Sequence, residues 1–338
     1  MINRDWEYPN KEETFFPLRK ERMFWIDKQG KHHIVNNQWA LVDDRDRILS
    51  IVTDRYNLIT NEDAYHWADY VIRGVFMGCS LSDFECFNVL MPTTRGSCRL
   101  DLIIPNSFKY PFGNKDSWVP FIRISNSYNK TIVLKYEVGF CRWICKNGVI
   151  IDQKGITFSF NHTEKISREW IESISTKAHK EIGEIGSLWS VFQMKLKKLN
   201  DIEVPISLWL AIFCKVFDID TNKEKLTENQ INRLVKKTTQ IKESSKEYSS
   251  ELGINAYALF NVLTDYASFP SDSYNTSNFI HGYQQKVGAW VNEFLFEVER
   301  TNFNLKSYIG EKALSSANFL ESKVNKSIEQ TDLFTFYE

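Results

Sequence analysis

Cationic and aromatic residues alternate along one stretch of the chain, from Trp118 to Lys146. Flat rings can stack on bases and cations can neutralise phosphates, which is the chemistry of single-stranded nucleic-acid binding. Tyr, Trp and Arg side chains also supply much of the energy of protein interfaces. We therefore take this stretch as the candidate macromolecule-binding site. Its candidate residues are Arg123, Asn126, Ser127, Tyr128, Lys130, Lys135, Arg142, Trp143 and Lys146.

A purely structural interpretation of the same stretch competes with this hypothesis. Alternation along a strand places Ile122, Ile124, Leu134, Tyr136 and Phe140 on a buried face. The basic residues would then form only the solvent-facing side of the sheet. The sequence leaves both interpretations open.

Carboxylates are a second group of candidate functional residues, because metal-dependent nucleases need two or three of them around one ion. Asp83, Glu85 and Asp101 lie on neighbouring predicted strands, and an acidic turn spans residues 43–46. Neither group is followed by the strand Glu-x-Lys of restriction-type nucleases. Solvated strand edges and turns are the favoured interpretation, and a metal-dependent nuclease is the third functional hypothesis.

The six cysteines and six histidines do not repeat at metal-binding spacings. Cys141 and Cys145 would share one face of a strand, but no second pair lies nearby, so a buried apolar role is favoured. His32 and His33 are adjacent and would point to opposite faces of a strand. Glycine-rich phosphate loops are absent from the sequence. We expect no metal, no cofactor and no enzymatic activity.

Composition limits the classes of protein that remain. The 42 Lys and Arg residues nearly balance the 43 Asp and Glu residues, so the formal net charge of −1 excludes a whole-molecule polyelectrolyte. The 338 residues can bury a core without disulfides. Aromatic residues reach 14%, which exceeds what one sheet and one helical bundle need. Surplus rings on a surface indicate interfaces.

Neither the N-terminus nor any internal segment resembles a targeting or membrane-spanning sequence. Residues Met1 to Glu13 carry acids as well as bases and contain no apolar core region. The longest apolar run, Ile206 to Cys214, is about half the length that a bilayer span requires. We expect a soluble, intracellular protein with no membrane partner.

Hydrophobic periodicity predicts an antiparallel sheet from about Gln38 to His162, because apolar residues recur there with a period of two. Asn147-Gly148 predicts a two-residue type I′ hairpin turn, since both residues tolerate a positive φ. A helix with Asn61 as its cap is predicted to interrupt the sheet over residues 61–75.

After Ser167 the apolar period changes to about 3.5, which predicts helices. We expect them at residues 182–199, 206–217, 227–241, 254–266, 280–298 and 309–324, with a polar connector at residues 243–251. The predicted fold class is α+β, in which a mainly antiparallel sheet with one or more packed helices precedes a mostly helical half. The predicted domains are an N-terminal extension (1–37), a sheet domain (38–165) and a helical domain (166–338).

Three blocks of the sequence resemble a known family. They are Arg55–Ile59, Ser125–Thr131 followed by Gly139–Asn147, and Asn255–Tyr266. Together they resemble the family called domain of unknown function 932, also labelled phage/plasmid-like protein, over roughly residues 38–300. The resemblance implies a gene of phages, prophages or plasmids that acts in a bacterial cytoplasm, and it implies no reaction.

Aromatic surplus, neutral charge and the mobile-element resemblance together favour a non-enzymatic protein that binds a macromolecular partner. We expect a host or phage protein as partner, in the role of a counter-defence inhibitor of a host assembly, and we expect a homo-oligomer. The alternative is a single-stranded nucleic-acid binding or annealing protein that uses the strands between Arg123 and Lys146.

Overall fold

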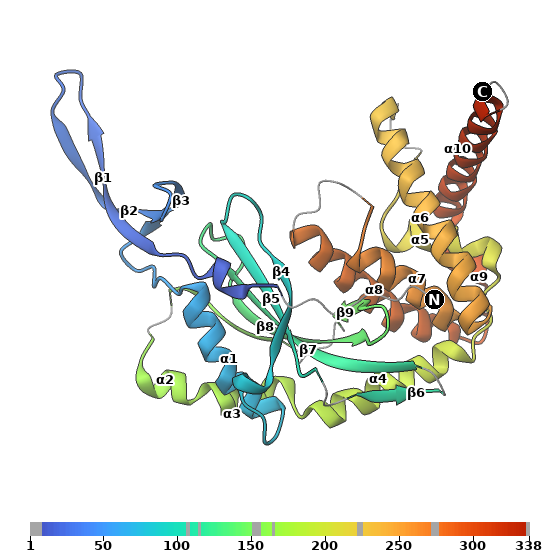
Figure 1. Cartoon of the computed structure of the whole chain (residues 1–338), viewed down its shortest axis with the longest axis horizontal. Helices are drawn as coiled ribbons and strands as arrows, with labels where there is room; N and C mark the ends of the chain where they lie inside the picture. The colour runs from blue at the N-terminus through green and yellow to red at the C-terminus, as the bar shows by residue number, and fades with distance from the viewer. Residues whose placement is uncertain are drawn as a thin grey trace.

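The structure is a computed structural model that describes residues 9–335, except 106–108, 114–115, 151–156, 164–165, 222–225 and 272–276. It confirms the α+β class: antiparallel sheets with helix α1 come first, and the C-terminal half is mostly helical (Figure 1). The smaller sheet has the order β1-β2-β3, and the larger one has the order β10-β8-β7-β5-β4, with β6 paired to β7 and β9 paired to β8.

The strands of the smaller sheet are β1 (Leu18–Ile26), β2 (His32–Asp43) and β3 (Ile48–Thr53). Those of the larger sheet are β4 (Glu85–Leu90), β5 (Ser97–Ile103), β6 (Tyr110–Phe112), β7 (Asp116–Ser127), β8 (Leu134–Arg142), β9 (Gly148–Ile150) and β10 (Thr157–Phe160). The α-helices are α1 (Asn61–Val75), α2 (Arg168–Glu172), α3 (Ile174–Ile182), α4 (Ile185–Asn200), α5 (Trp209–Val216), α6 (Glu228–Leu252), α7 (Ala256–Ser268), α8 (Ser277–Val298), α9 (Leu305–Ile309) and α10 (Glu311–Thr335). Short 3₁₀ turns are η1 (Lys11–Thr14), η2 (Leu81–Asp83) and η3 (Ile206–Leu208).

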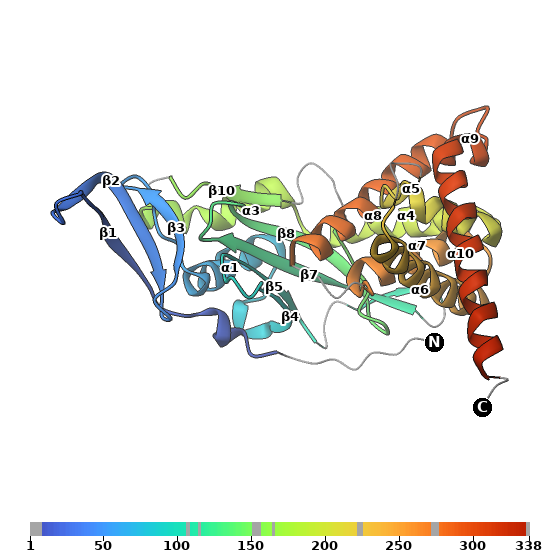
Figure 2. The same ribbon diagram turned by 90° about the horizontal axis from the view of Figure 1, so that it is seen from above.

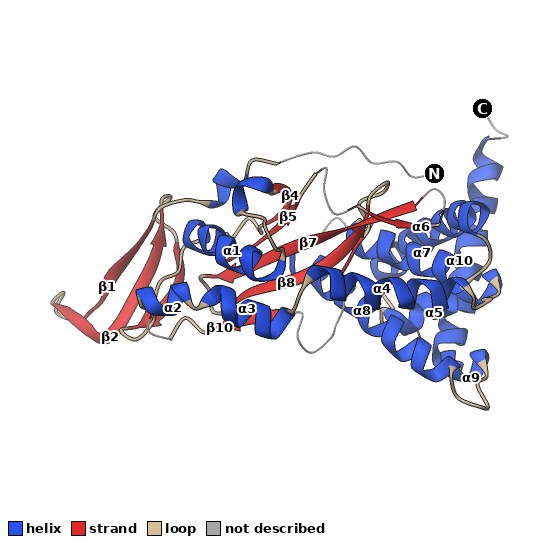
Figure 3. Ribbon diagram, turned by 90° about the horizontal axis from the view of Figure 1, so that it is seen from below, coloured by secondary structure: helices blue, strands red, loops and turns tan. Residues whose placement is uncertain are grey.

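One face of the larger sheet packs against helices α1 and α3 (Figure 3). The apolar residues of β7 and β8 that alternate toward this side are buried, as the structural interpretation predicts: Ile122, Ile124, Leu134, Tyr136 and Phe140. The Tyr136 hydroxyl donates to the Ala64 carbonyl in α1, 2.7 Å away. We call the opposite side of the sheet its inner face.

Helix α1 begins with a capping box one residue earlier than predicted. Thr60 is the N-cap, and its hydroxyl accepts from the Asp63 amide at 2.9 Å while the Asp63 carboxylate accepts from the Thr60 amide at 3.0 Å. Asn61 is therefore not the cap. Its side-chain amide instead donates to the Thr14 carbonyl, which ties the N-terminal segment to the helix.

The predicted two-residue turn at Asn147-Gly148 is wrong. Cys141 pairs with Gly148, and the Arg142 amide donates to the Asn147 carbonyl at 3.0 Å. The turn therefore lies between Arg142 and Asn147, and Lys146 takes the positive φ of 57°. Gly148 instead allows the Gln284 side chain to approach the backbone closely, because a Cβ at position 148 would lie 3.0 Å from Gln284 Nε2.

The helical half begins where the period of the sequence changes, with Ser167 as the N-cap of α2. The polar connector predicted at residues 243–251 is wrong, because α6 continues without a break to Leu252. Small polar side chains in this segment pack against α7, and the Ser244 hydroxyl donates to the Asp265 carboxylate at 2.9 Å. Tyr248 is fully buried on the same helix.

A single apolar cluster runs from the sheet into the helices, across the expected boundary at residue 165. Trp118 of β7 lies 5.2 Å from Phe192 of α4 and 5.7 Å from Phe260 of α7, measured between ring centroids. At the other expected boundary, β2 runs through residues 37 and 38. The segment expected to be an extension thus supplies β1 and part of β2.

Gly139 tests the packing of the inner face. A Cβ at this position would lie 2.4 Å from the Phe121 ring and 2.7 Å from the Val149 carbonyl oxygen. We expect Gly139→Ala to lower the free energy of unfolding by about 2 kcal/mol, because the ring must move out of a packed layer. Urea denaturation measures this change. Gly186→Ala in α4 is the matched control, since a Cβ there meets nothing within 4 Å, and unchanged stability of both variants would contradict the prediction.

Candidate functional site

The structure separates the nine residues of the candidate site. Five of them are buried, so the interpretation that they are displayed on an outer binding face is wrong for Arg123, Asn126, Ser127, Tyr128 and Arg142. Lys135, Trp143 and Lys146 are half-buried, and Lys130 is exposed. The physical reason is that both faces of the larger sheet are covered, one by α1 and α3 and the other in part by the N-terminal half of α8.

Arg123 lies on the inner face and is bound to one carboxylate. Its guanidinium donates to both oxygens of Asp101 on the neighbouring strand β5, at 2.6 Å each. Its third contact is His281 of α8, with 3.3 Å between Arg123 Nη1 and His281 Nδ1. Burial opposes the charged form of Arg123, but the Asp101 carboxylate keeps the pKa of the guanidinium above its usual value.

Arg123 is part of a buried group of charges that we call the inner-face cluster. Its members are Arg99, Asp101, Arg123, Lys135, Glu137 and His281. Lys135 Nζ lies 2.6 Å from Glu137 Oε1, and Gln285 Nε2 donates to the same oxygen at 3.3 Å. Three cationic side chains therefore face two carboxylates.

Burial and neighbouring cations together lower the pKa values of two members of this cluster. Burial lowers the pKa of His281, and the nearby Arg123 and Arg99 act in the same direction, so that the pKa falls to about 2. Burial, together with the charge of Arg123, lowers the pKa of Arg99 to about 10. His281 is consequently neutral at physiological pH, and it adds no positive charge.

Arg142 joins the sheet to the helical half. Its guanidinium donates to Asp116 at 2.8 Å and to Glu251 of α6 at 2.7 Å. Tyr257 of α7 donates to the same Asp116 carboxylate and accepts from Trp118 Nε1 at 3.1 Å. Arg142 is thus a structural residue that holds α6 and α7 against the end of β7.

Asn126 and Tyr128 bind backbone groups of neighbouring segments. Asn126 Nδ2 donates to the Ile59 carbonyl at 3.0 Å, and the Tyr128 hydroxyl accepts from the Asn61 amide at 2.8 Å. Ser127 Oγ donates to the Ile132 carbonyl at 2.7 Å within the turn between β7 and β8. These side chains position the start of α1 and the turn.

The accessible members of the candidate site do not form one surface. Lys130, in the turn before β8, donates to the Ile51 carbonyl of β3 at 2.6 Å. Trp143, beyond the other end of β8, has the Lys109 ammonium 3.7 Å from its ring centroid. Lys146 lines a cavity of about 410 Å³ next to the inner-face cluster.

The candidate metal ligands are occupied or dispersed. Asp101 is bound by Arg123, and Asp43 is bound by Arg47 at 2.8 Å and by Arg95 at 3.3 Å. Burial raises the pKa of the Cys141 thiol well above its usual value. Over the described residues, no three or more His, Cys, Asp or Glu side chains gather as a metal site would require.

The sequence interpretation missed a hairpin with several exposed apolar side chains. The β1–β2 hairpin extends away from the body, as Figures 1 and 2 show, and β3 pairs with β2 only from Gln38 to Val42. We call residues 22–38 the projecting ribbon. Its large apolar side chains are half or more exposed: Phe24 54%, Trp25 54%, Ile26 61% and Ile34 50%.

The tip of the projecting ribbon is a well-defined turn. Asp27 Oδ1 accepts from the backbone amides of Gln29 and Lys31, and Gly30 takes a φ of 80°. His33 lies 2.6 Å from the Asp27 carboxylate and stacks on Trp25 with 4.5 Å between centroids. The Asp-Lys-Gln-Gly-Lys sequence between two β-rich runs indicates this hairpin, although it lies within the predicted N-terminal extension, residues 1–37.

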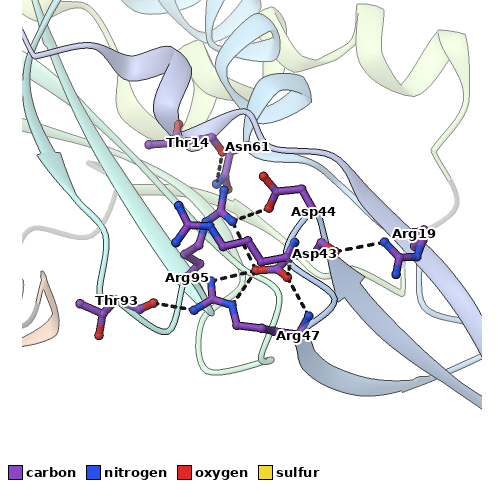
Figure 4. A network of polar contacts seen from close by, with 9 residues as sticks. Thr14, Arg19, Asp43, Asp44, Arg47, Asn61, Thr93 and Arg95 are labelled. Atoms are coloured by element: carbon purple, nitrogen blue, oxygen red, sulfur yellow. Dashed lines mark hydrogen bonds and ion pairs between the residues drawn. The ribbon is translucent and has the colours of Figure 1, made fainter.

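A polar network fixes the base of the ribbon to the body (Figure 4). Asp43, at the end of β2, accepts from the side chain and backbone of Arg47 and from Arg95. Arg47 also donates to the Thr93 carbonyl at 3.2 Å, and the Arg95 guanidinium lies 3.5 Å from the centroid of the Phe16 ring. The network connects the β2–β3 turn with the segment between β4 and β5.

Comparison with known proteins identifies the family. The family model described as domain of unknown function (DUF932) matches residues 48–269, from the start of β3 to the end of α7. The chain therefore belongs to the DUF932 family, as the resemblance predicts. No curated protein and no solved structure matches the chain. Each helix in the described ranges is too short or too polar to cross a lipid bilayer.

Asp101 is the residue on which the charge balance of the inner face depends. We expect Asp101→Asn to lower the free energy of unfolding by about 3 kcal/mol, because it leaves the Arg123 guanidinium buried without a carboxylate. Urea denaturation at neutral pH measures the loss. Glu85→Gln on the exposed side of β4 is the control. An Asp101→Asn variant as stable as the control would show that the pair does not hold the sheet.

Protonation of Asp43 should loosen the base of the ribbon. Burial alone would raise the pKa of this carboxyl, but hydrogen bonds from the Arg47 backbone and side chain lower it to about 2. Asp43 therefore stabilises the fold above its unfolded-state pKa of 3.8, and this stabilisation is lost as the pH falls from about 4 to 2.

Melting temperatures between pH 2 and pH 7 test this dependence. Asp43→Asn should lower the melting temperature at pH 7 and flatten its decline below pH 4. Asp46→Asn, which changes an exposed carboxylate of the same turn, should leave the profile of the wild type nearly unchanged. A profile for Asp43→Asn that is parallel to that of the wild type would refute the assignment.

Proposed function

We propose that this chain is a non-enzymatic binding protein of the phage and plasmid type, whose partner is another protein engaged by the projecting ribbon. In this proposal it acts in a bacterial cytoplasm as a counter-defence factor that occupies a host protein assembly. The observation that carries the proposal is the set of exposed apolar side chains on the ribbon.

The ribbon presents more apolar surface than a free two-stranded hairpin can shelter. Between Gln38 and the tip of the ribbon, no third strand of the described chain pairs with β1 or β2. Two strands alone are marginally stable in water and usually need another strand or helix on one face. Phe24, Ile26 and Ile34 lie on the same face of the ribbon, because Phe24 pairs with Ile34 and side chains alternate along a strand. An occupant that covers these three side chains would supply that face, and exposed apolar groups of this kind mark interaction sites.

The chemistry of the ribbon favours a protein over a nucleic acid. Ile26 and Ile34 are aliphatic, and both side chains are exposed. Such side chains gain free energy by burial against apolar protein surface, whereas nucleic-acid sites rely on cations and stacked rings. One face of the Trp25 ring already stacks on His33, which leaves less of it for a base.

A nucleic-acid partner is the second candidate, and one observation supports it. The ribbon carries Arg22, Lys28 and Lys31 against the single acid Asp27. Local positive charge of this kind can contact phosphates even when the net charge of the chain is −1. The cations that matter for this candidate lie on the ribbon, because Arg123 and Arg142 are buried in ion pairs.

Site-specific crosslinking tests the proposal. A photoreactive amino acid replaces Gln29 at the exposed tip of the ribbon, the protein is expressed in bacterial cells, and the crosslinked partner is identified and purified. The partner is then titrated against wild-type protein and against the triple variant Phe24→Ser, Ile26→Ser, Ile34→Ser. We expect affinity to fall by roughly tenfold or more, since truncating buried anchors commonly costs over 1 kcal/mol each.

Ile48→Ser is the matched control, because Ile48 is 63% exposed on the same small sheet but lies outside the ribbon. Its affinity should stay close to that of the wild type. Retained affinity in the triple variant contradicts the proposal. Salt-dependent crosslinking to nucleic acid alone, weakened by Lys28→Gln and Lys31→Gln, would favour the second candidate. Crosslinking to a second copy of the chain, with a smaller mass for the triple variant by light scattering, would identify a homo-oligomer.

A further inference from the structure

A cavity of about 410 Å³ lies between the inner face of the larger sheet and the helices α7 and α8. This volume falls within the range of roughly 300–1,000 Å³ that is usual for small-molecule sites. The residues that matter for its chemistry come from β4, β7, the β8–β9 turn and the two helices. They are Phe87, Asn88, Phe121, Lys146, Ser268 and Gln284.

One buried polar group of the cavity is the side-chain amide of Gln284, which is 4% exposed. Its Nε2 donates to Ser268 Oγ at 3.2 Å, and that hydroxyl oxygen also accepts from the Gly148 amide at 2.9 Å. Gln284 Oε1 is buried and has no hydrogen-bond partner among the residues that the structure describes. A buried acceptor without a donor is unfavourable, so a ligand that donates a hydrogen bond to this oxygen would be stabilised.

The walls beside this acceptor are aromatic. The rings of Phe87 and Phe121 line the cavity and meet edge to face, with 5.8 Å between their centroids. The Phe121 ring is held in place because it lies directly over Gly139, where a Cβ would clash with it. Fixed rings of this kind favour a flat, apolar ring system in the ligand.

Positive charge lies at the edges of the cavity. Lys146 lines it directly, and Asp101, which also lines it, belongs to the inner-face cluster with its three cationic and two carboxylate side chains. Since Asp101 is bound by both arms of the Arg123 fork, it presents little free negative charge to a ligand. The surroundings therefore favour an anionic group at one end of the ligand.

From these features we infer that the cavity binds a nucleotide unit, with an N–H group of the base donating to Gln284 Oε1 and the phosphate near Lys146. Only a ligand with a donor, a flat ring and an anion meets all three features, and a fatty acid, for example, lacks the donor. The unit can come from a free mononucleotide or from the end of a single strand. This inference is independent of the proposed protein-binding function, which uses the projecting ribbon.

Calorimetry and ligand-observed NMR with the full-length protein test the inference. The probes are AMP, ribose 5-phosphate and a short 5′-phosphorylated oligodeoxynucleotide. We expect AMP or the oligonucleotide to bind, with saturation transfer to the base protons, and ribose 5-phosphate to bind at least tenfold more weakly. Gln284→Met, which keeps the length of the side chain but removes the acceptor, should weaken binding by roughly tenfold.

Gln285→Met is the matched control, because Gln285 is the next residue of α8 and contacts Glu137 rather than the cavity. It should bind within about twofold of the wild type, and Lys146→Gln should weaken AMP and the oligonucleotide alike. Circular dichroism and melting curves confirm that each variant is folded.

Binding of the oligonucleotide alone, weakened by Gln284→Met, would identify a single strand as the source of the nucleotide. The inference is overturned if neither AMP nor the oligonucleotide binds, or if ribose 5-phosphate binds as well as AMP. It is also overturned if Gln284→Met and Gln285→Met bind these nucleotide probes equally well. The triple ribbon variant should bind AMP as the wild type does, so failure of the protein-binding proposal and failure of this one are distinguishable.

Discussion

The ion pair between Arg142 and Asp116 is the contact on which the arrangement of the two halves depends. Arg142 ends β8 and Asp116 begins β7, so the pair closes the end of the sheet where the helices attach. Glu251 of α6 accepts a further hydrogen bond from Arg142, and Tyr257 of α7 donates one to Asp116. Because Arg142 and Asp116 are both buried, removing Arg142 leaves the Asp116 carboxylate inside the protein without a cation. The apolar contacts of Trp118 with Phe192 and Phe260 are formed around this polar joint.

Burial on both faces explains the character of the larger sheet. One side carries the apolar residues expected of a sheet that packs on helices, and the other side carries paired charges beneath α8. A charged residue on a strand normally indicates solvent. Here the Arg123 side chain is enclosed because Asp101 is its direct cross-strand neighbour. Cross-strand pairing thus allows a strand of alternating pattern to be buried completely.

Local pattern in the sequence predicted much of the fold. The period of two predicted the antiparallel strands, and the change after Ser167 marked the start of the helices. Local pattern gave wrong predictions where the burial of a side chain depends on partners that are distant in the sequence. The charges of Arg123 and Arg142 predicted a surface, but their carboxylate partners, 22 and 26 residues away, place them inside. The polar segment at residues 243–251 predicted a connector, but Ser244 and Tyr248 find partners in α7 and in Asn147. The cavity could not be predicted, because its lining residues come from β4 to α8.

The two strands of the projecting ribbon leave and re-enter the small sheet as direct neighbours, with Arg22 opposite Trp39. The residues between them form a hairpin whose two ends are adjacent in the small sheet. Exchanging that hairpin for one of different sequence would leave the path of the remaining chain unaltered, since Asp43 and Arg95 secure the sheet on the near side of the junction. The architecture is therefore suited to accepting other ribbon sequences by grafting, while the rest of the fold stays unchanged.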